Sequence, residues 1–233
     1  MKICILFIYS HIDCYNNMFN IQQKYVHKHN NVDSFFVKFD NLQNDDIIIN
    51  DDIISVKGEE LLINILDKTI KSFQLLLPNN YDFFIRTNVS TIIDIEKLMC
   101  YLENAPKTNY YGGSSYKLQW LDPTFGIVDK TYWGVTFSRG INIILSSDLV
   151  QNMVINKDKL NYSIIDDVSI SIYLHENVPD AISNLLKYNV PYAYVTMDNY
   201  KEVQRNYMFY RNKSDNRNND IITMNHMLDL IYS

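Results

Sequence analysis

Short apolar runs of strand length alternate with amphipathic helical segments along the first half of the sequence. Residues 2–9, 34–39 and 81–87 form the apolar runs, and each is rich in Ile, Val or Phe. Between them, residues 16–29 and 59–76 carry apolar side chains at helical spacing. Strands that alternate with helices predict an α/β fold with a mostly parallel sheet. Such a sheet binds ligands at the carboxyl ends of its strands, so the segments that follow the runs are the first candidates for a site.

The second half of the sequence is more irregular and more aromatic. No shift in composition marks a linker, and a length of 233 residues suits one large domain. The remaining elements are expected as helices over 94–103, 145–154, 166–175 and 221–232, and as strands over 109–112, 131–137 and 191–197.

Composition and charge exclude several classes of protein. The net charge is −6, and without a concentrated basic patch we expect no binding to nucleic acid. Cys4, Cys14 and Cys100 have no paired spacing, which indicates a reducing compartment and gives no zinc motif. The apolar start is too short to span a membrane, and no cleavage site follows it. We therefore expect a soluble, cytoplasmic protein without a membrane span.

Motifs of several common enzyme classes are absent from the sequence. No GxGxxG follows the first apolar run, and no GxxxxGK followed by Ser or Thr occurs. These absences disfavour dinucleotide-binding domains and P-loop NTPases. GxSxG and HExxH are also missing, which disfavours serine hydrolases and zinc peptidases.

The most informative segment is residues 81–91, YDFFIRTNVST, in which an apolar strand runs directly into a polar cluster. A helix is expected close behind it, near Asp94. One interpretation is an ordinary strand–loop–helix corner with Asn and Ser as turn residues. The other is a ligand site at the carboxyl end of the strand.

This junction resembles the strand that leads into the DxD motif of GT-A glycosyltransferases, particularly the fringe and β-1,3-galactosyltransferase-like group. Residues 64–69, NILDKT, are similar to the NLTLKT helix that precedes the motif in that group, and residues 52–54, DII, match its upstream strand. The resemblance implies a GT-A fold, in which helices flank a Rossmann-like nucleotide-binding sheet and the C-terminal half binds the acceptor.

The sequence departs from that group where an acidic triplet is expected, because Asn88-Val89-Ser90 stands there. In the group, carboxylates hold a Mn²⁺ or Mg²⁺ ion that bridges the donor diphosphate. Asn88 and Ser90 supply oxygen ligands without charge, so we expect an enzyme that is metal-independent or only weakly dependent on Mn²⁺ or Mg²⁺. In the first case Lys68, Arg86 or a basic residue near the C-terminus neutralises the diphosphate.

Two later segments follow the order of the same group. Residues 133–149, WGVTFSRGINIILSSDL, are similar to its SGxGYVLSRDL element, with Arg139-Gly140 at the SG position. The resemblance implies that donor and acceptor approach closely there. Residues 165–168, IDDV, resemble its (E/D)DV motif, which opens a helix and supplies the catalytic base.

Sugar transfer with inversion requires a base that takes the proton from the acceptor hydroxyl as it attacks the anomeric carbon. The resemblance leads us to assign Asp167 as this base and Asp166 as the alternative. A structural interpretation, in which both acids cap a solvated helix, stays open.

The resemblance also indicates donor contacts at both ends of the sequence. Ser10, His11 and Asp13 follow the first strand, where the group holds the uracil and ribose of its donor. Arg211 lies in a basic segment similar to the C-terminal end of the group, from which it would reach the diphosphate. A solvated charge run is the alternative for that segment.

The expected acceptor contacts lie in the middle of the sequence. Trp120 and Trp133 are candidates for stacking on a sugar ring, and packing into the core is the alternative for both. Arg139 and Gly140 are the other two residues that we expect to contact the acceptor.

The sequence therefore predicts one GT-A domain over 1–233, with a nucleotide-sugar-binding half over 1–115 and an acceptor-binding, catalytic-base half over 116–233. We expect a hexosyl- or deoxyhexosyltransferase that moves a sugar from a nucleotide-sugar, UDP-linked, to a glycan acceptor. Such an enzyme suits glycan synthesis in a bacterium or in cells infected by a large DNA virus.

A catalytically inactive sugar-binding or scaffold protein with the same fold is the alternative, because the acidic triplet is lost. A nucleotide-processing enzyme with two metal ions ranks third, since acid pairs are few.

Overall fold

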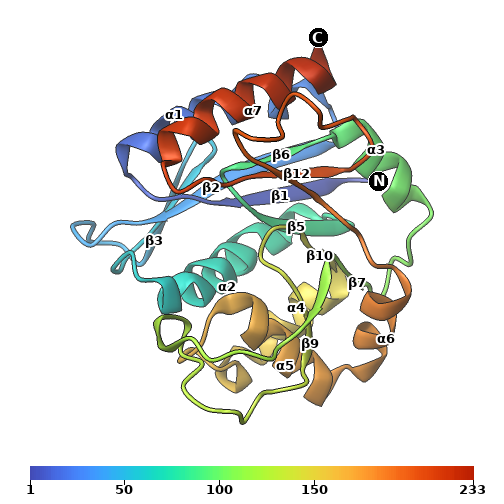
Figure 1. The fold of residues 1–233 in the computed structure, drawn as a ribbon. Coiled ribbons are helices and arrows are strands. Elements are labelled where there is room, and N and C mark those ends of the chain that lie inside the picture. The colour runs from blue at the N-terminus through green and yellow to red at the C-terminus, as the bar shows by residue number, and fades with distance from the viewer.

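A seven-stranded sheet, ordered β3-β4-β2-β1-β5-β10-β7, forms the centre of the molecule (Figure 1). The computed structural model describes residues 1–233 and every side chain except that of Asp13, so the donor contact expected for Asp13 lies outside the described side chains. The strands of the sheet are β1 (Ile3–Ile8), β2 (Val32–Phe39), β3 (Ile47–Asn50), β4 (Ile53–Val56), β5 (Phe83–Asn88), β7 (Tyr111–Gly112) and β10 (Ile143–Ser146).

The sheet is mixed. Strands β4, β2, β1 and β5 run parallel to one another, whereas β3, β7 and β10 pair antiparallel with their neighbours. The α/β fold expected from the sequence is confirmed, and antiparallel pairing joins both distant strands, such as β10 and β5, and strands adjacent in sequence. For example, β3 and β4 form a hairpin whose turn begins at Asp51, which adopts a φ of 53°.

Helices cover both faces of the sheet (Figure 1). Successive side chains of β1 point to opposite faces, so Ile5 and Phe7 join one core cluster while Leu6 and Ile8 join the other. The first cluster includes α1, α3 and α7, and the second includes α2, α4, α5 and α6. The helices are α1 (Asp13–Gln23), α2 (Ile65–Leu76), α3 (Ile95–Glu103), α4 (Ser147–Ile155), α5 (Asp166–Asn177), α6 (Pro179–Lys187) and α7 (Arg217–Tyr232).

Helix α2 begins later than its apolar pattern predicts. Leu66, Ile70 and Phe73 are buried at helical spacing, as expected. The expected first turn, from residue 59, is not helical, because the Glu60 side chain turns inward and accepts hydrogen bonds from the Phe39 backbone N–H and from Lys68. The prediction was therefore correct for the buried face and wrong for the start.

Other element boundaries also differ from the expectations. Residues 131–134 form turns rather than a strand, with Gly134 at a φ of 89°, and the strand begins only with β9 (Thr136–Ser138). Residues 145–146 belong to β10 rather than to a helix, because β10 pairs with β5. Helix α6 and strand β12 (Phe209–Asn212) were not predicted from the sequence.

A second, three-stranded sheet brings the last part of the chain next to the first. It has the order β11-β12-β6, where β6 (Thr91–Ile93) follows β5 and β11 spans Ala193–Val195. Because β12 pairs antiparallel with β6, residues near 211 lie beside the turn that connects β5 to β6. A separate hairpin joins β8 (Ser115–Lys117) to β9.

None of the helices described within residues 1–233 is both long enough and apolar enough to cross a membrane.

Candidate active site

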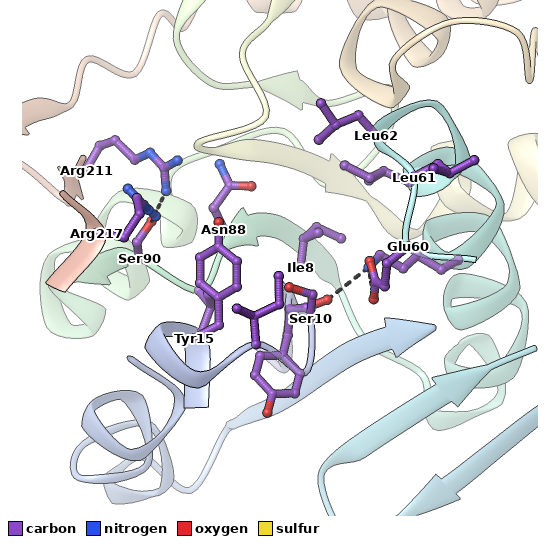
Figure 2. A pocket seen from close by; sticks show the side chains of 15 residues that line it. Ile8, Ser10, Tyr15, Glu60, Leu61, Leu62, Asn88, Ser90, Arg211 and Arg217 are labelled. Carbon is purple, nitrogen blue, oxygen red and sulfur yellow. Dashed lines mark hydrogen bonds and ion pairs between the residues drawn. The ribbon is translucent and has the colours of Figure 1, made fainter. Parts of the chain in front are cut away.

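A cleft opens at the carboxyl ends of β1 and β5, which end side by side because Ile8 pairs with Asn88. Its first part, the small cavity, has a volume of about 310 Å³ and is lined by Ser10, Asn88 and Ser90, among others (Figure 2). Its second part, the large cavity, has a volume of about 750 Å³. The residues that line both cavities are Tyr15, Leu62, Ile65, Asn88, Arg211 and Arg217. The two cavities therefore form one continuous cleft.

Two arginines meet at Ser90, at the position where the resembled group has acidic residues. The Ser90 hydroxyl oxygen accepts a hydrogen bond from Arg211 Nη1 and another, of 3.1 Å, from Arg217 Nη2 (Figure 2). Arg217 also pairs with Asp220, whereas no described carboxylate forms an ion pair with Arg211. Burial and the neighbouring charge of Arg217 lower the pKa of Arg211 to about 10. The cleft thus holds an uncompensated positive charge at this point.

The turn that carries Ser90 is fixed from two sides. Gln22 on α1 donates to the backbone oxygens of Val89, at 2.6 Å, and Thr91, at 2.9 Å. On the other side, the Asn212 backbone N–H donates to the backbone oxygen of Ser90 at 3.0 Å. Because β12 is hydrogen-bonded to this turn, the side chain of Arg211 lies next to Ser90.

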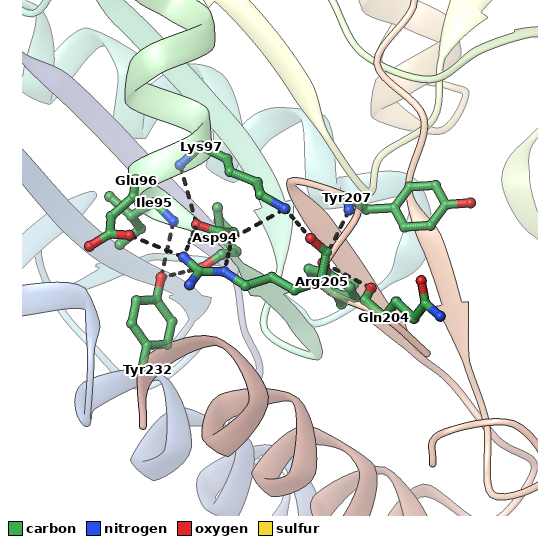
Figure 3. Close-up of polar contacts among 10 residues, drawn as sticks. Asp94, Ile95, Glu96, Lys97, Gln204, Arg205, Tyr207 and Tyr232 are labelled. Atoms are coloured by element: carbon green, nitrogen blue, oxygen red, sulfur yellow. Dashed lines mark hydrogen bonds and ion pairs between the residues drawn. The ribbon is translucent and has the colours of Figure 1, made fainter. Parts of the chain in front are cut away.

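An ion pair fixes the segment before β12. Arg205 donates from Nε to Asp94 Oδ2, and from Nη2 to Asp94 Oδ1 at 3.0 Å and to Glu96 Oε2 at 3.1 Å (Figure 3). Asp94 is fully buried, and it also caps α3 by accepting from the Lys97 backbone N–H at 3.2 Å. This contact ties the start of α3 to the segment that leads into β12.

Replacing Arg205 by Gln is expected to lower the free energy of unfolding by about 1–3 kcal/mol, because it leaves the buried Asp94 carboxylate short of a partner. The value is at the low end for an ion pair since 36% of the Arg205 side chain is exposed. Urea denaturation measures the change. Glu96→Gln removes the exposed partner of the same arginine and should cost about 0.5 kcal/mol or less. Equal effects of the two variants would contradict this account.

Lys68 is a buried lysine that lines the small cavity. Its Nζ donates to the Tyr9 backbone oxygen at 2.9 Å and to the two oxygens of Glu60 at 3.0 and 2.8 Å. Burial lowers the pKa of Lys68, and the charge of Glu60 opposes that shift. All three ammonium hydrogens thus have partners in the protein, and Lys68 orients Glu60 toward the cavity.

The two residues expected after β1 behave differently. Ser10 lines the small cavity. His11 is exposed, its Nδ1 lies 3.3 Å from the Tyr9 hydroxyl, and it lines neither cavity. The turn after β1 therefore brings Ser10, and not His11, to the cleft.

Arg86 and Asp166 form a buried ion pair at the floor of the large cavity. Arg86 Nε lies 2.8 Å from Asp166 Oδ2, and Nη2 lies 3.1 Å from Oδ1. The two side chains are only 3% and 1% exposed. Arg86 Nη1 also donates to the Gly140 backbone oxygen and to Asn88 Oδ1. The sequence-based roles of donor contact for Arg86 and of alternative base for Asp166 are therefore less suitable than a positioning role, because each group is occupied by the other.

Asp167 lines the large cavity beside this ion pair. Its Oδ2 accepts from the Gly140 backbone N–H at 2.9 Å, and its Oδ1 accepts from the Val168 N–H at 2.8 Å. Burial and the adjacent charge of Asp166 raise the pKa of Asp167 to about 6, against the opposing effect of Arg86. A carboxylate with this pKa is ionised at neutral pH and is more basic than an ordinary aspartate, as a general base requires.

Gly140 allows this arrangement. A Cβ atom at residue 140 would lie 2.5 Å from Arg86 Nη1, so only glycine lets the loop before β10 approach the ion pair. The loop is held at the end of β5 by the Thr87 hydroxyl, which donates to the Ile141 oxygen at 2.6 Å. The pairing of β10 with β5 thus brings Gly140 and Asp167 together.

Aromatic side chains form one wall of the large cavity. Trp120 lines it, with its ring centroid 5.6 Å from that of Tyr116 and 5.8 Å from that of Phe137. Trp133 does not line it, and instead Lys130 lies over its ring at 4.6 Å. Of the two tryptophans expected to contact the acceptor, only Trp120 therefore lies in the cleft.

Several cleft residues were not identified from the sequence. Arg217 and Tyr15 lie in both cavities, with the guanidinium carbon of Arg217 5.6 Å from the centroid of the Tyr15 ring. Tyr116 and Tyr192 line the large cavity. For Arg217 the only local signal was its place in a polar segment just before the helix predicted over 221–232, which does not distinguish a ligand contact from a solvated charge.

A divalent cation does not fit the residues at this position. Among the described side chains, no cluster of three or more His, Cys, Asp or Glu residues is suited to a metal ion. Asn88 Oδ1 accepts from Arg86, and Ser90 Oγ accepts from two guanidinium groups. A cation bound to these oxygens would be repelled by the arginines at close range.

Comparisons with known proteins do not assign a family. No family model matches the chain, and no curated protein matches its sequence. Among solved structures it is similar to the apo-form glycosyltransferase GlyE of Streptococcus pneumoniae TIGR4, with a TM-score of 0.42 and 10% sequence identity. That alignment covers 92% of this chain and 55% of the GlyE chain, so this chain spans about half of that protein. A likeness of this size carries no argument about function.

Proposed function

We propose that the chain is a GT-A glycosyltransferase that moves a sugar from a nucleoside diphosphate sugar, UDP-linked, to a hydroxyl group of a glycan acceptor. One observation carries the proposal: a single cleft holds an anion-binding pair of arginines at one end and a basic carboxylate, Asp167, in the adjoining cavity. The motif order in the sequence supports the same reading. The proposed site draws on both halves of 1–233, because Ser90 belongs to the N-terminal half whereas Arg211 and Arg217 lie near residue 233.

The donor diphosphate is proposed to bind at Arg211 and Arg217. Two guanidinium groups that share one hydroxyl oxygen repel each other, and a diphosphate between them would relieve that repulsion. Arginine presents paired N–H donors that match phosphate oxygens. As the bond to the anomeric carbon breaks, negative charge grows on the departing diphosphate, and the same donors stabilise it.

Asp167 is proposed as the base. It takes the proton from the acceptor hydroxyl while that oxygen forms the new bond to the anomeric carbon, and the bond from this carbon to the diphosphate oxygen breaks. The Gly140 and Val168 N–H groups hold the carboxylate in place. Arg86 and Asp166 support the loop and the helix from which these contacts come.

Replacing Arg211 or Arg217 by Gln should weaken UDP binding by about 10- to 100-fold, because each change removes a charged hydrogen-bond donor. Isothermal titration calorimetry in EDTA measures this, and wild-type protein should bind UDP equally with and without the chelator. Lys28→Gln is the matched control, since it removes an exposed positive charge that lines neither cavity. Binding that disappears in EDTA would rule out the arginine site.

The loss of the acidic triplet favours one other candidate, a binding protein that uses the same cleft without catalysis. Nucleotide release from a panel of UDP-sugars separates the two. The enzyme releases UDP from at least one member of the panel, whereas the binding protein binds UDP and releases nothing.

A further inference from the structure

We infer that the acceptor carries a negatively charged group, a carboxylate or a phosphate, and that Arg139 binds it. The inference rests on the proposed function, since it concerns the acceptor of that reaction. It names the class of acceptor, acidic rather than neutral glycans.

Arg139 is held rigidly by neutral groups. Its guanidinium carbon lies 3.9 Å from the centroid of the Tyr116 ring, and its Nη1 donates to the Tyr192 hydroxyl at 2.7 Å. No described carboxylate forms an ion pair with it, and its Nε and Nη2 groups donate to no described residue. An arginine fixed in this way presents a charge and free donors to the large cavity, which it lines.

The balance of charged side chains in the large cavity also supports an anionic acceptor. Its lining contains two carboxylates, Asp166 and Asp167, and the first of these is neutralised by Arg86. Arg211 and Arg217 lie toward the small cavity and are assigned to the donor. Two further cations of the lining, Arg139 and Lys213, form no ion pair with a described carboxylate. Asp167 can balance only one of them, so one positive charge of the lining lacks a counter-charge. An anionic group on the bound acceptor would supply that counter-charge.

The position of Arg139 suits an acceptor rather than a donor. Arg139 lines the large cavity but not the small one. The next residue, Gly140, donates its backbone N–H to Asp167 at 2.9 Å. An acceptor anchored on Arg139 would therefore have its hydroxyl groups in the same cavity as the base. The Trp120 ring, tilted by 59° to the Tyr116 ring that the guanidinium covers, lines the same cavity and offers an aromatic face that suits a sugar ring.

A purely structural role for Arg139 makes a different prediction. If the residue only joined the loop after β9 to Tyr192, its loss would affect acidic and neutral ligands equally. Discrimination between ligands that differ in one charged group is therefore the decisive readout.

The test measures binding of methyl β-glucuronide, methyl β-glucoside and glucose 6-phosphate to UDP-loaded protein by NMR titration. We expect the glucuronide or the phosphate to bind about 10- to 100-fold more tightly than the glucoside, and the stronger of the two identifies the anion. Arg139→Gln should abolish the preference, and Arg139→Lys should retain part of it. Equal binding of the three ligands to the wild type would overturn the inference, as would a preference that survives in Arg139→Gln.

A second measurement separates this inference from the proposed function. Hydrolysis of the donor by the wild type uses water as the acceptor, so it tests the proposed function without a glycan, whereas Arg139→Gln should raise the KM for an acidic acceptor. Intact hydrolysis without any preference among acceptors would overturn only the anionic acceptor. Absence of UDP binding and of hydrolysis would overturn the proposed function, and the sugar titrations without UDP would still decide whether Arg139 selects anions. Thermal unfolding of each variant verifies that it is folded.

Discussion

Under the proposed function, replacing Asp167 by Asn is expected to lower the rate of sugar transfer by about 10²- to 10⁴-fold, the usual contribution of a general base. Asparagine keeps the size of the side chain and can still accept from the Gly140 N–H, so the cleft keeps its shape. It has no lone pair basic enough to take a proton. UDP binding should remain within about twofold of the wild type, because the arginine pair is unchanged.

The pH dependence of the wild type provides an independent check. Only ionised Asp167 acts as a base, and its pKa is raised to about 6. Transfer should therefore be constant above that pH and should fall about tenfold for each unit below it.

For the Asp167→Asn substitution, Asp158→Asn is the matched control, because Asp158 is exposed and lines neither cavity. An Asp167→Asn variant that keeps a third or more of the wild-type rate would contradict the assignment.

Replacing Arg86 by Met lowers the free energy of unfolding by about 3–5 kcal/mol, because it leaves the Asp166 carboxylate buried without its partner. The loss is expected to be larger than that of Arg205→Gln, since both members of this pair are almost fully buried. Equilibrium denaturation in urea measures it. Circular dichroism verifies that the variant is folded in the absence of urea.

The double variant with Arg86→Met and Asp166→Leu tests the cause of that loss. With both charges removed, no buried charge lacks a partner, so the double variant should be more stable than Arg86→Met alone. Its transfer rate should nevertheless stay low, because Gly140 and Asp167 lose their support. A double variant less stable than Arg86→Met would show that packing, and not the unpaired charge, causes the loss.

The sequence predicted the parts of the fold that depend on local periodicity. The apolar runs at 2–9, 34–39 and 81–87 became β1, β2 and β5, because strands buried on both faces carry a continuous apolar signal. Strand β12 was missed, since its FYRN sequence has neither an apolar run nor strict alternation, and its pairing with β6 stabilises it. The start of α2 was misplaced because the Glu60 side chain accepts from the backbone N–H of Phe39, which lies 21 residues earlier in another element.

The residues of the candidate site also fall into those that local sequence motifs predicted and those that depend on how distant segments fold together. Asp167, Gly140 and Ser90 could be selected from the order of motifs along the chain. Arg217 could not, because its meeting with Ser90 depends on how β12 and α7 fold back over a separation of 127 residues. His11 and Trp133 were selected by position in the sequence, and the direction of their side chains, which the sequence does not specify, takes them outside the cleft lining.

The pairing of β12 with β6 also sets the order in which the protein can mature on the ribosome. A nascent chain that has emerged only as far as residue 208 contains β1, β5, Ser90 and Asp167, but neither of the arginines that meet at Ser90. Contacts between segments so distant along the chain form late in folding, because a long loop must close first. A nascent fragment that ends at residue 208 therefore lacks both arginines proposed to bind the donor, and we expect it to be unable to retain UDP.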